Sequence, residues 1–356
     1  MRYTLSLVAL LSGMALLCGC GGSNDTNSPG PGGVKPADRI TGSGSSFVAP
    51  LMKKWAGSYN KATQLEVDYT SKGSSTGIAE MIDQKNDFGG TDAPMNEEQL
   101  KKAHEKNGEV INIPLTMGPV APFYNLPEIE KPLNFTGPIL ADIYLGKIKK
   151  WNDPALQKIN PGVKLPDKEI VVVHRRDGSG TTDIWTDYLS KMSPEWQKGP
   201  GRGLEVKWPV GQTESGNAGV AEFVRKNPGS IGYVELSYAH REGLDLGLVQ
   251  NREGEFVKAR LQSITAAADS ALTHIPDDLR YSLTDAPGKA SYPVSGTTWA
   301  LVYARQPAGK GRQLVDFLGW VLGEGQEDAE QLLYARLPEG LAARAHAKLE
   351  QIQVGQ

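Results

Sequence analysis

Short apolar runs alternate with amphipathic stretches along the chain beyond residue 38. Runs rich in β-branched residues, which are typical of buried strands, occur at 65–70, 110–115, 169–174, 231–234 and 297–303. Apolar residues spaced three or four apart, which are typical of helices, occur at 49–61, 77–83, 182–189 and 218–225 and through most of 313–351. This alternation predicts an α/β architecture with largely parallel sheets.

Length and composition fit a globular protein of two domains. The chain has 356 residues, of which 39% are apolar and 22% charged, so it is neither disordered throughout nor a polytopic membrane protein. The formal net charge is -3, which lacks the basic surplus of a nucleic-acid-binding protein. We therefore expect no nucleic-acid partner, and any anion site must be local.

The N-terminus has the pattern of an export signal. Arg2 precedes an apolar run over 5–17 that is short for a bilayer span, although a buried N-terminal helix is an alternative. The sequence LCGC at 17–20 resembles a bacterial lipobox, which implies a lipoprotein signal peptide at 1–19 and lipid attachment to Cys20. Residues 20–37 would be the lipidated cysteine and a flexible tether, because they are rich in Gly, Pro, Ser and Asn.

This pattern predicts an exported protein. We expect it on the periplasmic or cell-surface side of the membrane, to which lipid on Cys20 would hold it. Cys18 and Cys20 are the only cysteines of the chain. The folded body therefore has no disulfide, no thiolate metal site and no cysteine nucleophile. With no H-E-x-x-H motif or Cys/His cluster either, the sequence predicts no metal and no cofactor.

A cluster of Gly and hydroxyl residues stands directly before a predicted helix three times. The clusters are TGSGSSF at 41–47, GSSTG at 73–77 and DGSGTT at 177–182. A helix N-terminus carries unpaired N–H groups and a partial positive charge, Gly allows close approach, and Ser and Thr add donors. Each cluster alone is more often a helix cap, but three at strand-to-helix turns favour an anion site. Arg175, beside the third cluster, is either a donor to that anion or a solvated strand end.

Asp92, in the segment DFGGTDAP at 87–94, is either a turn former or part of the same site. A carboxylate repels an anion unless the anion donates a proton to it. Phosphate that carries one or two protons can donate, whereas fully ionised sulfate cannot. In the site, Asp92 would therefore select a protonated oxyanion.

Seven segments resemble, in order along the chain, the extracytoplasmic phosphate-binding subunit of the bacterial high-affinity phosphate ABC transporter. They are TGSGSSFVAP (41–50), GSSTG (73–77), DFGGTDAP (87–94), DIYLGKIKKWND (142–153), RRDGSGT (175–181), VKWPVG (206–211) and GSIGYVE (229–235). The resemblance extends from about residue 40 to residue 337 and implies capture of inorganic phosphate in an interlobe cleft for delivery to the importer. Its implied partners are the membrane permease subunits with their ATPase, and its implied state is a monomer.

The resemblance also implies a set of site residues. The phosphate-binding residues would be Ser46, Phe47, Ser74, Asp92, Arg175, Ser179, Gly180 and Thr181. Asp92 would accept the proton of the ligand, Asp177 would orient Arg175, and Ser75 would be a supporting residue. No residue would be catalytic.

The fold implied by the resemblance is a two-lobed periplasmic-binding-protein fold. Each lobe would be a mixed sheet flanked by helices, and the chain would cross the hinge twice. Lobe I would contain residues 38–124 and 299–356, and lobe II residues 125–298.

An enzyme is the alternative interpretation. GSSTG at 73–77 satisfies G-x-S-x-G, the nucleophile elbow of a serine hydrolase, with Ser75 as nucleophile. Of the five histidines, only His174 lies at a predicted strand end, and its neighbours are two arginines that oppose its protonation. A lipid-anchored serine hydrolase is therefore less favoured than an anion-binding protein, and an exported adhesion protein would not need three anion loops.

Overall fold

The long strand β4 (Val110–Tyr124) runs through both lobes of the protein. In the computed structural model, which describes residues 39–243 and 245–355, residues 110–119 pair with β12 (Val294–Tyr303) and residues 120–124 pair with β8 (Ser230–Glu235). Every residue of β4 after Val110 is buried, as expected for a strand that is covered on both faces. β4 thus ties the two lobes into one sheet.

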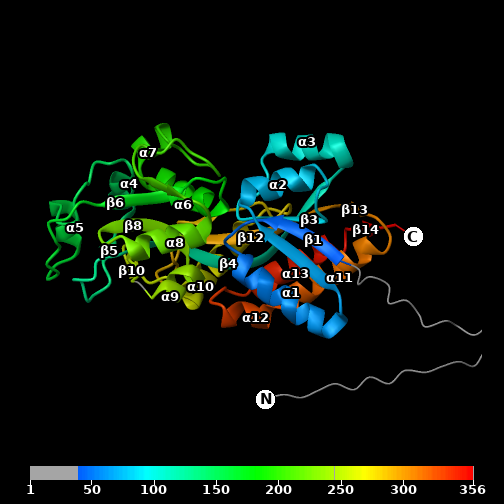
Figure 1. The fold of residues 1–356 in the computed structure, drawn as a ribbon. Coiled ribbons are helices and arrows are strands. Elements are labelled where there is room, and N and C mark those ends of the chain that lie inside the picture. The colour runs from blue at the N-terminus through cyan, green and yellow to red at the C-terminus, as the bar shows by residue number, and fades with distance from the viewer. Residues whose placement is uncertain (1–38, 244, 356) are drawn as a thin grey trace, which may run out of the picture. The chain divides into compact units, whose positions relative to one another are not determined.

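The sheet has the strand order β2-β1-β3-β12-β4-β8-β6-β7, and β12 and β4 lie where the lobes meet (Figure 1). The first lobe contributes the parallel strands β1 (Arg39–Gly44), β2 (Glu66–Ser71) and β3 (Phe88–Thr91). The second lobe contributes β6 (Val171–Arg175) and β7 (Gln212–Glu214), parallel to each other, with β6 also parallel to β8. Among the short strands, β11 (Leu283–Thr284) pairs with β12. A separate small sheet consists of β5 (Asn134–Phe135), β9 (Leu248–Gln250) and β10 (Phe256–Val257). Another consists of β13 (Arg305–Gln306) and β14 (Gln353–Val354).

Helices flank the sheet in each lobe (Figure 1). Those of the first lobe are α1 (Ala49–Thr63), α2 (Ser74–Ile82), α3 (Glu97–Asn107), α11 (Lys310–Leu322), α12 (Gln326–Gln331) and α13 (Glu339–Leu349). Those of the second are α4 (Gly137–Tyr144), α5 (Pro154–Ile159), α6 (Gly180–Met192), α7 (Pro194–Lys198), α8 (Gly216–Lys226), α9 (Leu236–Glu242) and α10 (Leu261–Ala271), which a 3₁₀ turn (Leu272–His274) extends. The architecture is α/β with two lobes.

The predicted strands and helices are confirmed, with most ends shifted by a few residues, but the strand predicted at 110–115 continues to residue 124. The prediction of largely parallel sheets was wrong in the middle of the sheet. There β12 is antiparallel to β3 and β4, and β4 is antiparallel to β8. Parallel neighbours need a crossover connection, usually a helix. β4 and the segment that leads into β12 instead connect the lobes, so the parallel order holds only on either side of them.

The pattern of apolar residues did not predict β1 and β3, because both strands are rich in glycine. Helix α2 packs directly on their backbones. An added Cβ on Gly77 of α2 would lie 2.6 Å from the Cα of Gly44 and 2.7 Å from the carbonyl oxygen of Gly90. The glycines therefore bring the start of α2 close to the ends of β1 and β3, which is where the candidate site lies.

The predicted signal peptide, the lipidation residue Cys20 and the tether to residue 37 lie outside the described residues. Within the described part of the chain, each helix is too short or too polar to serve as a membrane span.

We predict that Gly77→Ala destabilises the protein by about 1–3 kcal/mol, because the new methyl group would collide with strand backbone that cannot move aside cheaply. The matched control is Gly57→Ala in the exposed face of α1, where an added Cβ meets nothing within 4 Å. That change should stabilise by up to about 1 kcal/mol, since Ala is a better helix former than Gly. Urea unfolding of both variants measures the difference, and equal stability of the two would contradict the packing argument.

Candidate anion-binding site

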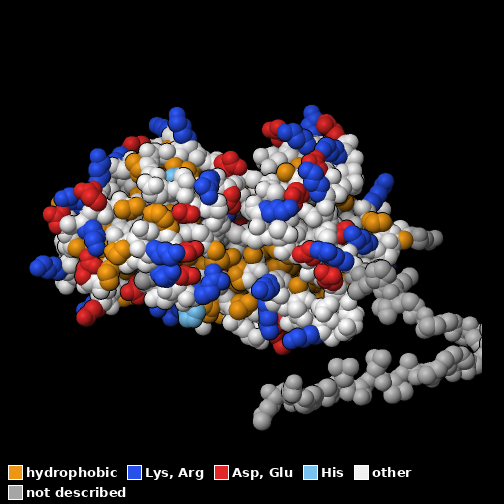
Figure 2. All heavy atoms as spheres, viewed as in Figure 1, with side chains coloured by type: hydrophobic (Ala, Val, Ile, Leu, Met, Phe, Trp, Pro, Cys, Tyr) orange, Lys and Arg blue, Asp and Glu red, His pale blue; other side chains and the backbone are white. Residues whose placement is uncertain are grey.

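The candidate site lies where strands of both lobes end and helices begin. In the first lobe α1 follows β1 and α2 follows β2, and in the second lobe α6 follows β6 and α8 follows β7. The carboxyl ends of parallel strands share one edge of a sheet, which is where ligands of open α/β sheets bind. The space-filling view in Figure 2 shows a hollow between the lobes at the top of the face that it draws.

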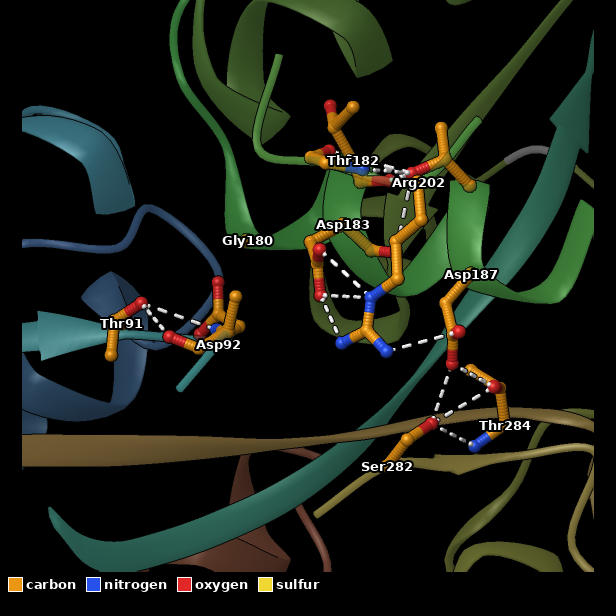
Figure 3. Close-up of polar contacts among 12 residues, drawn as sticks. Thr91, Asp92, Gly180, Thr182, Asp183, Asp187, Arg202, Ser282 and Thr284 are labelled. Carbon is orange, nitrogen blue, oxygen red and sulfur yellow. Dashed lines mark hydrogen bonds and ion pairs between the residues drawn. The ribbon is translucent and has the colours of Figure 1, made fainter. Parts of the chain in front are cut away.

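The N-termini of α2 and α6 contact each other across the two lobes. Ser74 Oγ accepts the N–H of Gly180 at 3.1 Å and the N–H of Asp92 at 3.3 Å. The N–H of Ser75 donates to the carbonyl oxygen of Gly178 at 3.1 Å. An added Cβ on Gly180 would lie 2.6 Å from Asp92 Oδ2, so only glycine fits at this contact. Figure 3 shows Asp92, which follows β3 of the first lobe, and Gly180, which begins α6 of the second lobe.

The predicted site residues come from these loops, and most of them are buried. The buried ones are Ser46, Phe47, Ser74, Asp92, Arg175, Ser179, Gly180 and Thr181, whereas Ser75 and Asp177 are partly exposed. Hydrogen bonds join Ser74, Asp92 and Gly180 directly. The N–H of Phe47 is directed to Ser45 Oγ at 2.9 Å, within its own loop.

Three hydroxyl groups of the site accept hydrogen bonds and, among the described residues, donate none. Ser179 Oγ caps α6 by accepting the N–H of Thr182 at 3.1 Å. Ser46 Oγ and Thr181 Oγ1 both accept from the side chain of Asn217, at 3.1 and 3.0 Å. A hydroxyl group carries one proton, so each of these groups can still donate it to an oxygen atom of a ligand.

Arg175 is a buried cation with one donor atom unpaired. Its Nε donates to Asp177 Oδ1 at 2.8 Å, and its Nη2 pairs with Asp177 Oδ2. Burial alone would raise the pKa of Asp177, but the guanidinium and the N–H of Gly216 hold it below its ordinary value. Nη1 is buried and has no hydrogen-bond partner among the described residues. Because an unpaired buried donor is costly, Nη1 is a strong indication of a ligand contact.

Asp92 is a buried carboxyl group that accepts hydrogen bonds from two hydroxyl groups. Ser45 Oγ donates to its Oδ1 at 2.7 Å and its Oδ2 at 2.5 Å, and Thr298 Oγ1 donates to Oδ1 at 2.6 Å. Burial raises the pKa of Asp92 to about 6, against the lowering effects of these hydroxyl groups and of the charge of Arg175. Above that pH the carboxylate is ionised, so it can accept a proton that a ligand donates.

Three polar residues of the site were not predicted. Ser45 and Thr298 support Asp92, and Asn217 connects the loops of the two lobes. Asn217 had a signal in the sequence, because GQTESGN at 211–217 is a fourth cluster of Gly and hydroxyl residues directly before a helix. Thr298 had no such signal, since it lies in the middle of the fully buried strand β12 and not in a loop before a helix.

An ionic network holds α6 in place behind its N-terminus (Figure 3). Arg202 donates to Asp183 and Asp187, which lie one turn apart on α6, at distances of 2.7–3.2 Å. Ser282 Oγ donates to Asp187 Oδ2 at 2.6 Å, and Thr284 Oγ1 pairs with the same oxygen. Asp183 is in the first turn of α6, and Arg202 compensates its charge there, so it opposes an anion at this helix end less than a free carboxylate would.

Glu235 is a fully buried carboxyl group at the junction of the lobes. It accepts the N–H of Ser237 at 3.0 Å and the hydroxyl group of Tyr334 at 3.0 Å, and Tyr334 also contacts the carbonyl oxygen of Phe47 at 2.7 Å. Burial, together with a smaller effect of the charge of Asp92, raises the pKa of Glu235 to about 8, against the lowering effect of the Ser237 and Tyr334 hydrogen bonds. At neutral pH the protonated form therefore predominates.

Comparison with known proteins identifies the family. Residues 29–324 match the PBP superfamily domain. The phosphate-binding protein PstS of Pasteurella multocida is 43% identical over 315 residues, which cover 88% of this chain and 90% of that protein. The protein of the same name from Xylella fastidiosa, strain Temecula1, is 40% identical over 331 residues, which cover 92% of this chain and 90% of that protein.

A solved structure supports the fold. The phosphate-binding protein from Stenotrophomonas maltophilia is 17% identical with a TM-score of 0.67, and the match covers 87% of this chain and 93% of that chain. Fold and site thus define a two-lobed binding protein of the PBP superfamily, as predicted. Within that superfamily, the chain belongs to the family of the phosphate-binding proteins PstS.

The serine hydrolase alternative has no support from these comparisons, since the family is one of binding proteins. Ser75 lies at the start of α2, and its N–H contacts Gly178. Within 39–243 and 245–355, no histidine forms a hydrogen bond with Ser75, so the nucleophile and base of such an enzyme are not paired.

We predict that Glu235 makes the protein less stable as pH rises from 6 to 8. Its pKa in the folded state, about 8, lies above its ordinary value of 4.5. The stability that the protonated group contributes is therefore fully present below about pH 4.5 and is lost as pH rises through 8. The pKa of Asp92 is raised in the same sense, from 3.8 to about 6, so the stability that its protonated form contributes is already lost near pH 6.

Glu235→Gln should flatten the fall in thermal midpoint between pH 6 and 8, because Gln is neutral throughout. Glu222→Gln, an exposed position on α8, is the control and should keep the slope of the wild type. Differential scanning calorimetry across this range provides the measurement. An unchanged slope in Glu235→Gln would show that Glu235 is already ionised at pH 6.

Proposed function

We propose that this protein is an extracytoplasmic solute-binding protein that captures inorganic phosphate between its lobes and delivers it to an ABC-type importer. The observation that carries the proposal is Arg175 Nη1, a buried donor near the N-terminus of α6 that has no hydrogen-bond partner among residues 39–243 and 245–355. The names of the PstS relatives support the same ligand.

The chemistry of the site fits a protonated phosphate. Donors come from Arg175 Nη1, from the hydroxyl groups of Ser46, Ser179 and Thr181, and from helix N-termini that favour negative charge. The remaining proposed contacts are Phe47, Ser74 and Gly180, with Ser75 and Asp177 as supporting residues. Asp92 supplies the acceptor, which matches a ligand that keeps a proton and disfavours one that has none.

Closure of the lobes would complete the site. Ser74 and Asp92 belong to the first lobe, and Arg175, Ser179, Gly180 and Thr181 belong to the second. We propose lobe I as 38–124 and 299–356 and lobe II as 125–298, so that the chain crosses the hinge between the lobes at the end of β4 and again within β12. Hinges of this kind let a ligand shift the protein toward the closed form, because only that form makes both sets of contacts.

The cell envelope would be the setting of this function. A lipoprotein signal peptide at 1–19 would export the chain, and lipid on Cys20 would hold it to the membrane through the tether to residue 37. The closed monomer would dock on the permease subunits of the phosphate ABC transporter, which work with an ATPase. We propose no enzymatic activity, in keeping with a family of binding proteins.

Arg175→Lys should weaken phosphate binding by roughly 10- to 100-fold, because a lysine cannot both pair with Asp177 and present a second donor to the ligand. Arg176→Lys is the matched control, since the neighbouring side chain is exposed and contacts Ser215. Isothermal titration calorimetry with inorganic phosphate tests both variants. Wild-type protein that does not bind phosphate would refute the proposed function, and equal affinities of the two variants would remove Arg175 from the site.

Asp92→Asn should reduce the preference for phosphate over sulfate more than it reduces phosphate affinity. The amide can donate to sulfate, whereas the carboxylate repels it. Competition of sulfate against bound phosphate at pH 8, where Asp92 is ionised, measures the preference. Asp87→Asn, in the same segment but paired with Thr41 and Lys310, controls for the loss of one carboxylate. An equal loss of affinity for phosphate and for sulfate would refute the role of Asp92 as proton acceptor.

A further inference from the structure

Asn217 occupies a position that none of the three predicted loops contains. It is the second residue of α8, directly after the loop that follows β7, and it is fully buried. Its side chain makes three hydrogen bonds. Nδ2 donates to Ser46 Oγ at 3.1 Å in the first lobe and to Thr181 Oγ1 at 3.0 Å in the second, and Oδ1 accepts the N–H of Glu235 at 3.0 Å.

The partner of Oδ1 fixes the orientation of the amide. A backbone N–H can only donate, so the atom that faces the N–H of Glu235 must be the oxygen. Nδ2 must then face the two hydroxyl groups, and both of its protons are used by them. The backbone N–H of Asn217 adds a third donor, to Ser46 Oγ at 3.3 Å.

This orientation decides what the two hydroxyl groups can do. Ser46 Oγ accepts two hydrogen bonds from Asn217, which uses both of its lone pairs. Its proton must therefore point away from Asn217. Thr181 Oγ1 accepts one hydrogen bond from Nδ2, so its proton also points away from the amide. Without the amide, each hydroxyl group could rotate and present an oxygen lone pair to an anion instead of a proton.

We propose that Asn217 is a positioning residue for the bound anion, which forces the hydroxyl groups of both lobes to act as donors and holds the lobes together when they close. This inference rests on the proposed function. The role in holding the lobes together follows from the position of Asn217, because its Nδ2 lies on a helix of the second lobe and donates to Ser46 of the first. That bond exists only when the lobes are in contact.

A role in closure affects the two rate constants of binding unequally. Phosphate first meets the open form, in which Asn217 does not reach Ser46, so the association rate constant is unaffected by the side chain. Release requires the lobes to separate and the bond to break. Loss of Asn217 therefore accelerates release, as most changes at a binding interface do.

Two variants test this role. Asn217→Leu keeps the size of the side chain but removes its donors and acceptor, and Asn217→Asp keeps the shape but presents an acceptor to both hydroxyl groups. Asn217→Leu should weaken phosphate binding by roughly tenfold or more, through faster release with an unchanged association rate constant. Asn217→Asp should weaken it further, because the carboxylate takes the hydroxyl protons and repels the anion. Asn227→Leu, at the other end of α8, is the matched control, since its exposed side chain contacts the carbonyl oxygen of Phe223.

The measurements use the full chain of each variant. Calorimetry gives the affinity, and release of radiolabelled phosphate into excess unlabelled phosphate gives the dissociation rate constant. Thermal midpoints separate binding effects from folding effects, and if one variant does not fold, the other provides the same test, with Asn217→Ser as a smaller replacement. Wild-type protein that fails to bind phosphate would refute the proposed function. Wild-type binding together with an Asn217→Leu release rate equal to that of wild type, or a loss confined to association, would overturn the role of Asn217 alone.

Discussion

The candidate site depends on buried hydrogen-bond donors that lie around the N-termini of α2 and α6. Arg175 is the centre of this set, because its guanidinium is buried and Asp177 pairs with only two of its nitrogen atoms. The pairing fixes the plane of the guanidinium and leaves Nη1 without a hydrogen-bond partner in the part of the chain that the structure describes. Moving an unpaired charge from water into the protein costs free energy, so the ion pair with Asp177 stabilises the buried guanidinium.

The other charges of the site are arranged so that they do not oppose an anion. Arg202 compensates Asp183 in the first turn of α6, and burial keeps Glu235 largely protonated at neutral pH. Asp92 is the exception, and its hydroxyl partners Ser45 and Thr298 favour its ionised form. A single acceptor among many donors is the pattern expected for a ligand that carries many lone pairs and few protons.

The sequence predicted much of this, for identifiable reasons. Clusters of Gly and hydroxyl residues before amphipathic stretches located the loops, since both the cap and the close approach need those residue types. The direction of β4 and β12 was not predictable from apolar runs, because a run shows burial and not the direction of a neighbour. β1 and β3 were missed because their glycines serve the packing of α2 and not burial of side chains. Thr298 was missed because its partner Asp92 is distant in sequence, on another strand end.

The position of β12 in the sheet has a consequence for the order in which the chain can fold. β12 lies between β3 and β4, so two strands formed early in synthesis are separated by one formed late. The first lobe cannot complete its sheet until residues 294–303 have arrived. A chain that emerges from its N-terminus would therefore leave β3 and β4 without their shared neighbour until nearly all of it had emerged, whereas β4, β8, β6 and β7 could already pair.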